Sequence, residues 1–406
     1  MKIRSLLQWA VALGGFLLTN PALMAQDWMQ TSAPSSGWIA IASSADGNKL
    51  VGVALNGDIV LSTNAGSTWS PSGAPSRAWY SVASSADGTK LVAGAGRNLE
   101  LGPGGIYTSA DSGLTWTNVF AAEHQYSIAS SADGVTLLAA ATLVIGVSRS
   151  LVSTNTGATW NSCDNPSKKP LWQADRYFVA VSANGTKLAA AASTGGIAIS
   201  QDSGTTWTMT GAPRYSWTSI ASSADGNRLV AATSGGGIYV SADGGLNWTL
   251  TSVPRSAYWT SVASSADGSR LVAVALYRFI YTSADSGLSW KASPPEALWQ
   301  AVASSADGDR LAAAVYSALT NGIPATIYTL HRTPSPTLAL QSANDHAVVL
   351  SWTLPSANLS LQWKAGLEAS EWRTVTNPPV LSISSLQNQV TMPLPASPAF
   401  YRLQTP

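Results

Sequence analysis

The chain has 406 residues, more than one ordinary domain requires, and 11% of them are charged, against about 25% in average soluble domains. A formal net charge of +1 argues against a nucleic-acid partner, which normally needs a basic face, and against attraction to an anionic membrane. Cys163 is the single cysteine and the three histidines are scattered, so the sequence predicts no intrachain disulfide, no metal site and no cofactor.

Residues 1–25 have the features of a secretory signal. Lys2 and Arg4 form a positive start, Leu6–Leu18 is apolar, and the segment ends on the small residue Ala25. The apolar run is too short to predict a membrane span. We therefore expect a protein that is secreted, periplasmic or at the cell surface, with no membrane span after cleavage; an uncleaved N-terminal anchor is the alternative.

A phrase, Ser-Ser-Ala-Asp-Gly, recurs through residues 26–332 at spacings of 40 to 51 residues. Its acidic position is occupied by Asp46, Asp87, Asp133, Asp225, Asp267 and Asp307, and by Asn184 in a degenerate seventh copy. About 40–45 residues is the span of one four-stranded propeller blade, and Asp-Gly between apolar runs favours a hairpin. In the fifth copy the four strands are expected at Trp217–Ser222, Arg228–Thr233, Ile238–Val240 and Asn247–Thr249.

A second turn in most repeats has the pattern Ser-x-Asp-x-Gly-x-x-Trp, as in Ser109 to Trp116. The Asp or Asn oxygen is expected to accept backbone N–H groups, the Gly to adopt a left-handed conformation and the Trp to fill the space beside the turn. These structural positions are Asn64, Asp111, Asn155, Asp202, Asp243 and Asp285. The pattern resembles the Asp-box (BNR) repeat.

The N-terminus supplies the strand that the seventh repeat lacks. A proline follows several box tryptophans by six residues, as Pro75 follows Trp69, and Trp28 and Pro34 have the same spacing. Residues 27–33 are therefore expected to pair with the last repeat, which ends at Ile327–Thr329 without a box of its own. The sequence predicts an all-β, seven-bladed β-propeller closed by its N-terminal strand, with no open sheet edge inside the ring.

The two kinds of tight turn are expected on one face of the disc and the variable loops on the other. Long insertions occur at Gly96–Gly104, Leu143–Ser150, Asn161–Asp175 and Ser317–Ala325. Five innermost strands begin with Trp, and Gln125 and Arg176 are predicted to interrupt this ring of aromatic residues around the central mouth. Loops on a rigid scaffold often bind ligands, so we expect a shallow cationic and aromatic site; a solvated loop with no ligand is the alternative. Its candidate ligand-binding residues are Gln125, Lys168, Lys169, Trp172, Asp175 and Arg176.

Box turns in an exported seven-bladed propeller resemble those of Ycf48-like photosystem assembly factors and sortilin-type receptors, which implies scaffold or protein-binding work. Sialidases also carry such boxes, but their six blades and Arg-Ile-Pro segment are not matched here, and no catalytic residue is predicted. We expect a monomeric, non-catalytic binding or scaffold protein with a protein or glycan ligand. The alternative is a carbohydrate-active enzyme, a sialidase-like glycoside hydrolase or a polysaccharide lyase, with Glu100, Glu123 and Asp175 as candidate carboxylates.

The C-terminal segment is expected to form a separate small domain. Residues 333–337 are proline-rich and predict a short stiff linker. Strand-like runs fill residues 338–406, and the runs Val348–Trp352 and Phe400–Leu403 resemble those of fibronectin type III-like modules. The sequence predicts a small β-sandwich here.

Overall fold

The computed structural model describes the chain in thirteen segments, which are residues 28–55, 57–121, 125–142, 150–163, 176–317, 324–332, 339–344, 347–353, 360–365, 371–376, 380–382, 387–393 and 399–404. Every regular element within these segments is a β-strand, so the fold class is all-β as predicted. The chain forms two compact units, of which Gln26–Arg332 is the larger. Among the described residues no helix has the length and apolar character that crossing a membrane requires. The predicted signal segment (1–25) and linker (333–337) lie outside the described residues.

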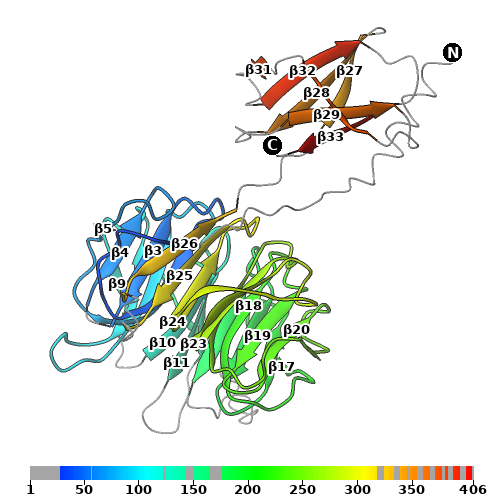
Figure 1. Ribbon diagram of the computed structural model, residues 1–406. Coiled ribbons are helices and arrows are strands. Elements are labelled where there is room, and N and C mark those ends of the chain that lie inside the picture. Colours follow the sequence, from blue (N-terminus) through cyan, green and yellow to red (C-terminus); the bar gives the residue numbers. More distant parts are fainter. Residues whose placement is uncertain are drawn as a thin grey trace. The chain divides into compact units, whose positions relative to one another are not determined.

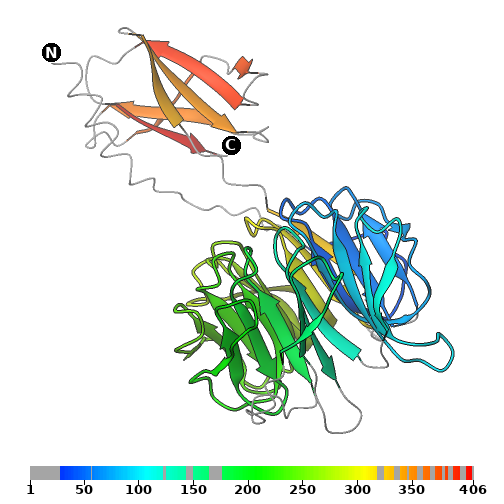
Figure 2. The ribbon, with the colours of Figure 1, turned by 180° about the vertical axis from the view of Figure 1, so that it is seen from behind.

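The larger unit is a β-propeller whose sheets fan around a common centre (Figures 1 and 2). Five of its sheets have four strands each, in simple up-and-down order. The first contains β2 (Trp38–Ser43), β3 (Leu50–Ala54), β4 (Ile59–Ser62) and β5 (Ser70–Pro71). The second contains β6 (Ala78–Ser84), β7 (Leu91–Gly96), β8 (Gly105–Ser109) and β9 (Thr117–Ala121). The third contains β10 (Gln125–Ser130), β11 (Leu137–Thr142), β12 (Ser150–Ser153) and β13 (Asn161–Ser162). The fourth contains β14 (Tyr177–Val181), β15 (Leu188–Ala192), β16 (Ile197–Ser200) and β17 (Thr208–Met209). The fifth contains β18 (Trp217–Ser222), β19 (Leu229–Thr233), β20 (Gly237–Ser241) and β21 (Thr249–Leu250).

The sixth sheet differs from the expectation of seven separate four-stranded sheets. It has six strands, in the order β1 (Met29–Gln30), β26 (Ile327–His331), β25 (Arg310–Val315), β24 (Lys291–Ser304), β23 (Leu271–Ser283) and β22 (Trp259–Ser264). Lys291 of β24 lies opposite Thr282 of β23, whereas Trp299 of the same strand lies opposite Val315 of β25. Because β24 continues through the connection between the last two repeats, their two ladders share one strand, and the propeller contains six sheets.

The predicted pairing of the N-terminal strand with the last repeat is confirmed. Met29 lies opposite Thr329 and Gln30 opposite Tyr328, in an antiparallel ladder. The side chain of Trp28 is 7% exposed and belongs to a core cluster with Trp299 and Tyr328. The first and last strands of the propeller therefore close its ring.

A continuous ring of backbone hydrogen bonds joins the Ala-Asp-Gly turns. The N–H of Ala45 donates to the carbonyl of Ala86, and the same contact is repeated from each turn to the next at 2.7–2.9 Å until Ala306 donates to Ala45. The alanines of this ring are Ala45, Ala86, Ala132, Ala183, Ala224, Ala266 and Ala306. Side-chain hydrogen bonds within each turn, such as those of Asp87 with Ser85 and Thr89, give the turns the same shape. Each turn can therefore bond to the next, and these bonds tie every repeat to its neighbour.

The core of the propeller lies between the sheets. One cluster, for example, joins Val51 and Leu61 of the first sheet to Trp79 and Leu91 of the second. The second and third strands are buried almost throughout, as in β3 and β15. Such continuous apolar strands are expected where both faces of a sheet are covered.

The smaller unit contains two sheets. One has the order β27 (Ala339–Asn344), β28 (Ala347–Thr353), β32 (Gln387–Pro393) and β31 (Val380–Ser382), and the other has the order β30 (Arg373–Thr374), β29 (Ser360–Ala365) and β33 (Ala399–Gln404). Val348, Leu350 and Val390 from the first sheet share a small core cluster with Leu361 from the second.

Candidate functional site

The propeller has two chemically different faces. The turn face carries the Ala-Asp-Gly turns and the box turns, which are adjacent because the N–H of Ser112 in a box donates to the carbonyl of Thr89 at 2.8 Å, and equivalent bonds recur in other repeats. The loop face carries the connections between second and third strands and those between repeats. The candidate ligand-binding residues were all predicted on the loop face.

The box turns are closed by their own side chains. Asp111 accepts the Thr115 N–H at 2.9 Å and hydroxyls from Ser109 and Thr115, while Ser109 accepts the Gly113 N–H at 2.9 Å. Asn64 takes the same position in the first repeat, accepting the Thr68 N–H at 2.9 Å. The residue before the box glycine is also left-handed, with φ of +59° at Ser112, which the sequence pattern did not indicate.

Turn-face charges are held within the fold. Hydrogen bonds from Ser85 and Thr89 lower the pKa of Asp87 to about 2, and bonds from Ser265 and Ser269 do the same for the pKa of Asp267. A basic side chain three residues after the turn acid reaches the neighbouring repeat; the members of this set are Lys49, Lys90, Lys187, Arg228, Arg270 and Arg310. The set was not predicted, although its spacing from the repeated Asp is visible in the sequence. These cations tie neighbouring blades together through hydrogen bonds, and Arg270 also forms an ion pair with Asp309.

The loop face has a different charge composition. Its described cations are all arginines, namely Arg77, Arg97, Arg176, Arg214, Arg255 and Arg278, and its described acids are Asp58, Glu100 and Glu296. All described lysines of the propeller lie on the turn face instead. Arg77 is held in place, because it donates to the Tyr107 hydroxyl at 3.1 Å and to the Leu101 carbonyl at 2.8 Å.

Two of the predicted ligand-binding residues come together at the central mouth. The Arg176 guanidinium donates to the Gln125 side-chain oxygen at 3.2 Å, joining the third and fourth repeats. Arg176 is exposed and Gln125 half-buried. The other four, Lys168, Lys169, Trp172 and Asp175, lie outside the described residues.

The expected ring of aromatic residues around the mouth is wrong. The innermost-strand tryptophans are fully buried between the sheets, as Trp79 is in its cluster with Tyr107. In repeats three and four their place is taken by Tyr126, opposite Ala141, and by Tyr177, opposite Ala192, rather than by Gln125 and Arg176. The five innermost strands that carry this Trp have a β-bulge directly after it, as between Trp79 and Ser81. Strands β10 and β14 are paired regularly there, so the aromatic residue lies one position later in their sequence. The aromatic series is thus uninterrupted and belongs to the core.

Exposed aromatic side chains do occur elsewhere on the loop face. Tyr215, Tyr258, Tyr277 and Tyr316 are 42–62% exposed. Tyr215 also packs against Tyr239 with a ring separation of 5.7 Å, so its ring is positioned rather than free. Sequence reasoning missed these residues because they have no common position in the repeat.

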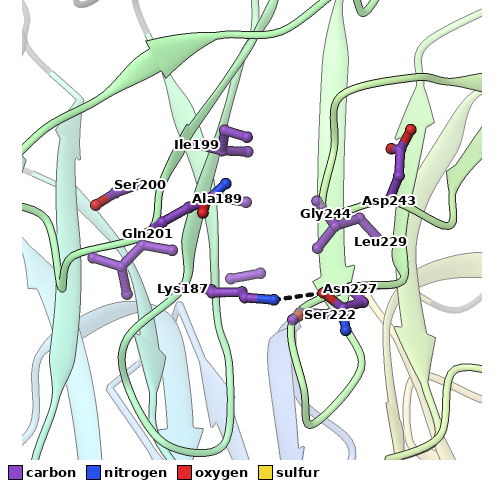
Figure 3. A pocket seen from close by; sticks show the side chains of 13 residues that line it. Lys187, Ala189, Ile199, Ser200, Gln201, Ser222, Asn227, Leu229, Asp243 and Gly244 are labelled. Carbon is purple, nitrogen blue, oxygen red and sulfur yellow. Dashed lines mark hydrogen bonds between the residues drawn. The ribbon is translucent and has the colours of Figure 1, made fainter.

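Two pockets lie on the turn face, away from the predicted site. One, of about 160 Å³, is lined by Lys187, Ser200, Gln201, Asn227 and Asp243, and Figure 3 shows the Lys187 ammonium donating to Asn227 across it. A second, of about 210 Å³, occupies the next seam between sheets, beside Arg228 and Ser286. Both are gaps between neighbouring blades. Within the described segments, no group of three or more His, Cys, Asp or Glu residues could hold a metal ion.

The fold and this site define an all-β propeller protein whose turn-face cations bond to neighbouring repeats and whose loop face bears arginines and tyrosines. No protein-family model and no curated protein sequence matches the chain. Solved structures similar to it include Ycf48 bound to a D1 peptide, with a TM-score of 0.54 and 14% identity over 76% of this chain and 96% of that one. Ycf48 from Cyanidioschyzon merolae has a TM-score of 0.54 and 16% identity over 75% of this chain and 99% of that one. A GH74 xyloglucanase from Xanthomonas campestris has a TM-score of 0.54 and 15% identity, covering 80% of this chain and 59% of that one. These likenesses establish the propeller fold.

Proposed function

We propose that this chain is an exported, non-catalytic propeller that binds a protein partner on its loop face. The observation that carries the proposal is the difference between the two faces. Charges on the turn face are used within the fold, whereas Arg176, Arg214, Arg255 and Arg278 are exposed on the loop face, which also carries exposed tyrosines. Tyr and Arg are the residue types that most often dominate binding energy at protein interfaces. A similar propeller, Ycf48, has a structure bound to a peptide.

The finer architecture is part of the same proposal. We count the six-stranded sheet as two blades that share β24, which makes seven blades. Seven turns joined in one closed hydrogen-bonded ring and innermost strands that follow one another in the ring β2, β6, β10, β14, β18, β22 and β24 support this count. The smaller unit is proposed to be a fibronectin type III-like sandwich, on the strength of two sheets with a shared core cluster.

Comparison of two matched variants tests the binding face. A Gln125→Ala/Arg176→Ala double variant removes the cross-repeat contact on the loop face, and Arg228→Ala removes an equally exposed arginine on the turn face. Immobilised full-length chain is expected to capture an exported protein, with capture reduced at least about fivefold in the double variant and unchanged in Arg228→Ala. Equal capture by all three chains would contradict a binding site at this position.

A carbohydrate-active enzyme is the second candidate, because a GH74 xyloglucanase is among the similar structures. Glu100 is an exposed loop-face carboxylate, whereas Glu123 and Asp175 lie outside the described residues. The same preparations are to be screened for hydrolysis of xyloglucan and sialoside substrates. Turnover that disappears in Glu100→Gln would overturn the non-catalytic proposal.

A further inference from the structure

Six of the seven seams between neighbouring repeats are crossed on the turn face by a basic side chain. Lys49 of repeat one, for example, donates to the Ser112 hydroxyl of repeat two at 3.2 Å. Its stem lies against the turn of repeat two, because a Cβ added to Gly88 would be 2.7 Å from it. Hydrogen bonds from a charged donor are stronger than neutral ones, so each of these cations helps to hold its seam closed. The side chains that bond across a seam in this way are Lys49, Lys90, Lys187, Arg228, Arg270 and Arg310.

The third seam, between repeats three and four, lacks such a cation. Thr136 takes the position, and a Cβ added to Gly185 would be 2.3 Å from its hydroxyl. Within the part of the chain that the structure describes, no hydrogen bond from the Thr136 side chain reaches repeat four. The turn acid that lies beside the cation in the other six seams is also replaced here, by Asn184. The acid and the cation are therefore missing together, from two positions that are far apart in the sequence but lie on either side of one seam.

Two further contacts across the third seam are weaker than their counterparts. The ring bond from the Ala132 N–H to the Ala183 carbonyl is 2.9 Å long, whereas the other six ring bonds are 2.7–2.8 Å long. The innermost strands on both sides of this seam, β10 and β14, carry Tyr126 and Tyr177 where the other five carry a buried tryptophan. A tyrosine ring has less apolar area to bury than an indole. The third seam thus differs from the others in its charges, its ring bond and its aromatic residues.

We propose that the third seam is a hinge at which the ring of the propeller opens before any other seam does. Local opening of a folded protein begins where the contacts that hold it are fewest and weakest. Opening here separates Gln125 from Arg176, whose hydrogen bond crosses the same seam on the loop face. A partner that contacts both residues would bind the closed seam and hold it closed. This last consequence rests on the proposed function, whereas the hinge itself does not.

Residue-resolved amide hydrogen exchange of the full chain tests the hinge. Ala86, Ala132 and Ala224 each follow a Ser and precede an Asp, so their amides have the same intrinsic exchange rate, and each donates one ring bond. We expect the Ala132 amide, which crosses the third seam, to exchange at least about threefold faster than the other two. Equal exchange of the three amides would overturn the hinge.

Two double variants interchange the composition of two seams. Thr136→Lys/Asn184→Asp gives the third seam the cation and acid of the others, and is expected to slow Ala132 exchange at least about threefold. Lys49→Thr/Asp87→Asn gives the first seam the composition of the third, and is expected to speed the exchange of Ala45, which donates the ring bond across it, by a similar factor. The Ala224 amide is the internal control, and its exchange is expected to stay unchanged in both variants.

Unchanged Ala132 exchange in the first variant, or unchanged Ala45 exchange in the second, would refute the claim that the missing cation and acid create the hinge. The comparison of Ala132 with Ala86 and Ala224 needs no substitution, so it decides whether the third seam opens first even where a double variant does not fold. Partner capture that depends on Gln125 and Arg176 is a separate measurement. The proposed function can therefore fail while the hinge stands, and the reverse.

Discussion

Replacing Trp28 by alanine measures how much the N-terminal strand contributes to ring closure. Its indole is 7% exposed and packs with Trp299 and Tyr328. Truncating a buried aromatic side chain to alanine costs about 3–5 kcal/mol. The Trp28 Nε1 is buried without a hydrogen-bond partner, and removing such a group returns about 1–3 kcal/mol of desolvation cost. We therefore expect Trp28→Ala to lower the free energy of unfolding by about 2 kcal/mol.

The unpaired N–H of Trp28 also predicts how a second substitution, Trp28→Phe, changes the stability of the protein. Five of the six other box tryptophans donate to the glycine carbonyl of their own box, as Trp116 does to Gly113 at 3.0 Å, but Trp28 has no box before it among the described residues. Trp28→Phe keeps most of the apolar area and removes the unpaired N–H, so we expect its stability to lie within about 1 kcal/mol of the wild type.

Urea unfolding followed by far-ultraviolet circular dichroism is the suitable assay, because tryptophan fluorescence changes with the substitution itself. Met29→Ala is the matched control, since Met29 is 70% exposed in the same short strand and its loss is expected to change stability by less than about 0.5 kcal/mol. An unfolding midpoint of Trp28→Ala equal to that of the wild type would refute the claim that this strand stabilises the ring.

Three further predictions concern the turn face. Ser200→Ala removes a 2% exposed hydroxyl that donates to Asp202 and accepts a backbone N–H, and we expect a loss of about 2 kcal/mol in urea unfolding; no loss would show that the box is not tied through this hydroxyl. Asp87 and Asp267 have folded pKa values of about 2 against roughly 3.9 in an unfolded chain, so their stabilising contribution is complete above about pH 4 and is lost as pH falls toward 2. A urea midpoint that is flat between about pH 5 and 2 would contradict this assignment. Gly88→Ala places a Cβ 2.7 Å from the Lys49 side chain at a φ of +66° and is expected to lower the melting temperature by several degrees; an unchanged melting temperature would show that the stem of this lysine moves aside at no cost.

Local structure in the propeller could be derived from the sequence because its determinants lie close together along the chain. Ser109, Asp111 and Thr115 close their turn through contacts that span two to four residues. Pairing of Met29 with Thr329 was also predictable, although the two are far apart, because the missing last strand of one repeat matched the extra strand at the start. A repeat pattern thus carries long-range information wherever every copy uses the same contacts.

Departures from the repeat were not predictable. The bulge that accompanies Trp79 is missing in β10, and this moved the aromatic position from Gln125 to Tyr126. Strand β24 continues through a connection that breaks the pairing in other repeats, and the two last ladders fuse. Both differences depend on how a strand is paired in register with its neighbour. The number of residues between a position and its turn does not predict that register.

The sequence by itself determined the all-β class, the tight turns and the closing strand of this protein, because those features depend on hydrogen bonds within a few residues and on a pattern copied from repeat to repeat. Only the tertiary structure decided which side chains are available to a partner. Trp79 is buried and Tyr277 is exposed although both are aromatic residues in propeller strands. The physical reason is that exposure is set by the neighbouring strands and sheets, which pack against one aromatic ring and leave the other in solvent.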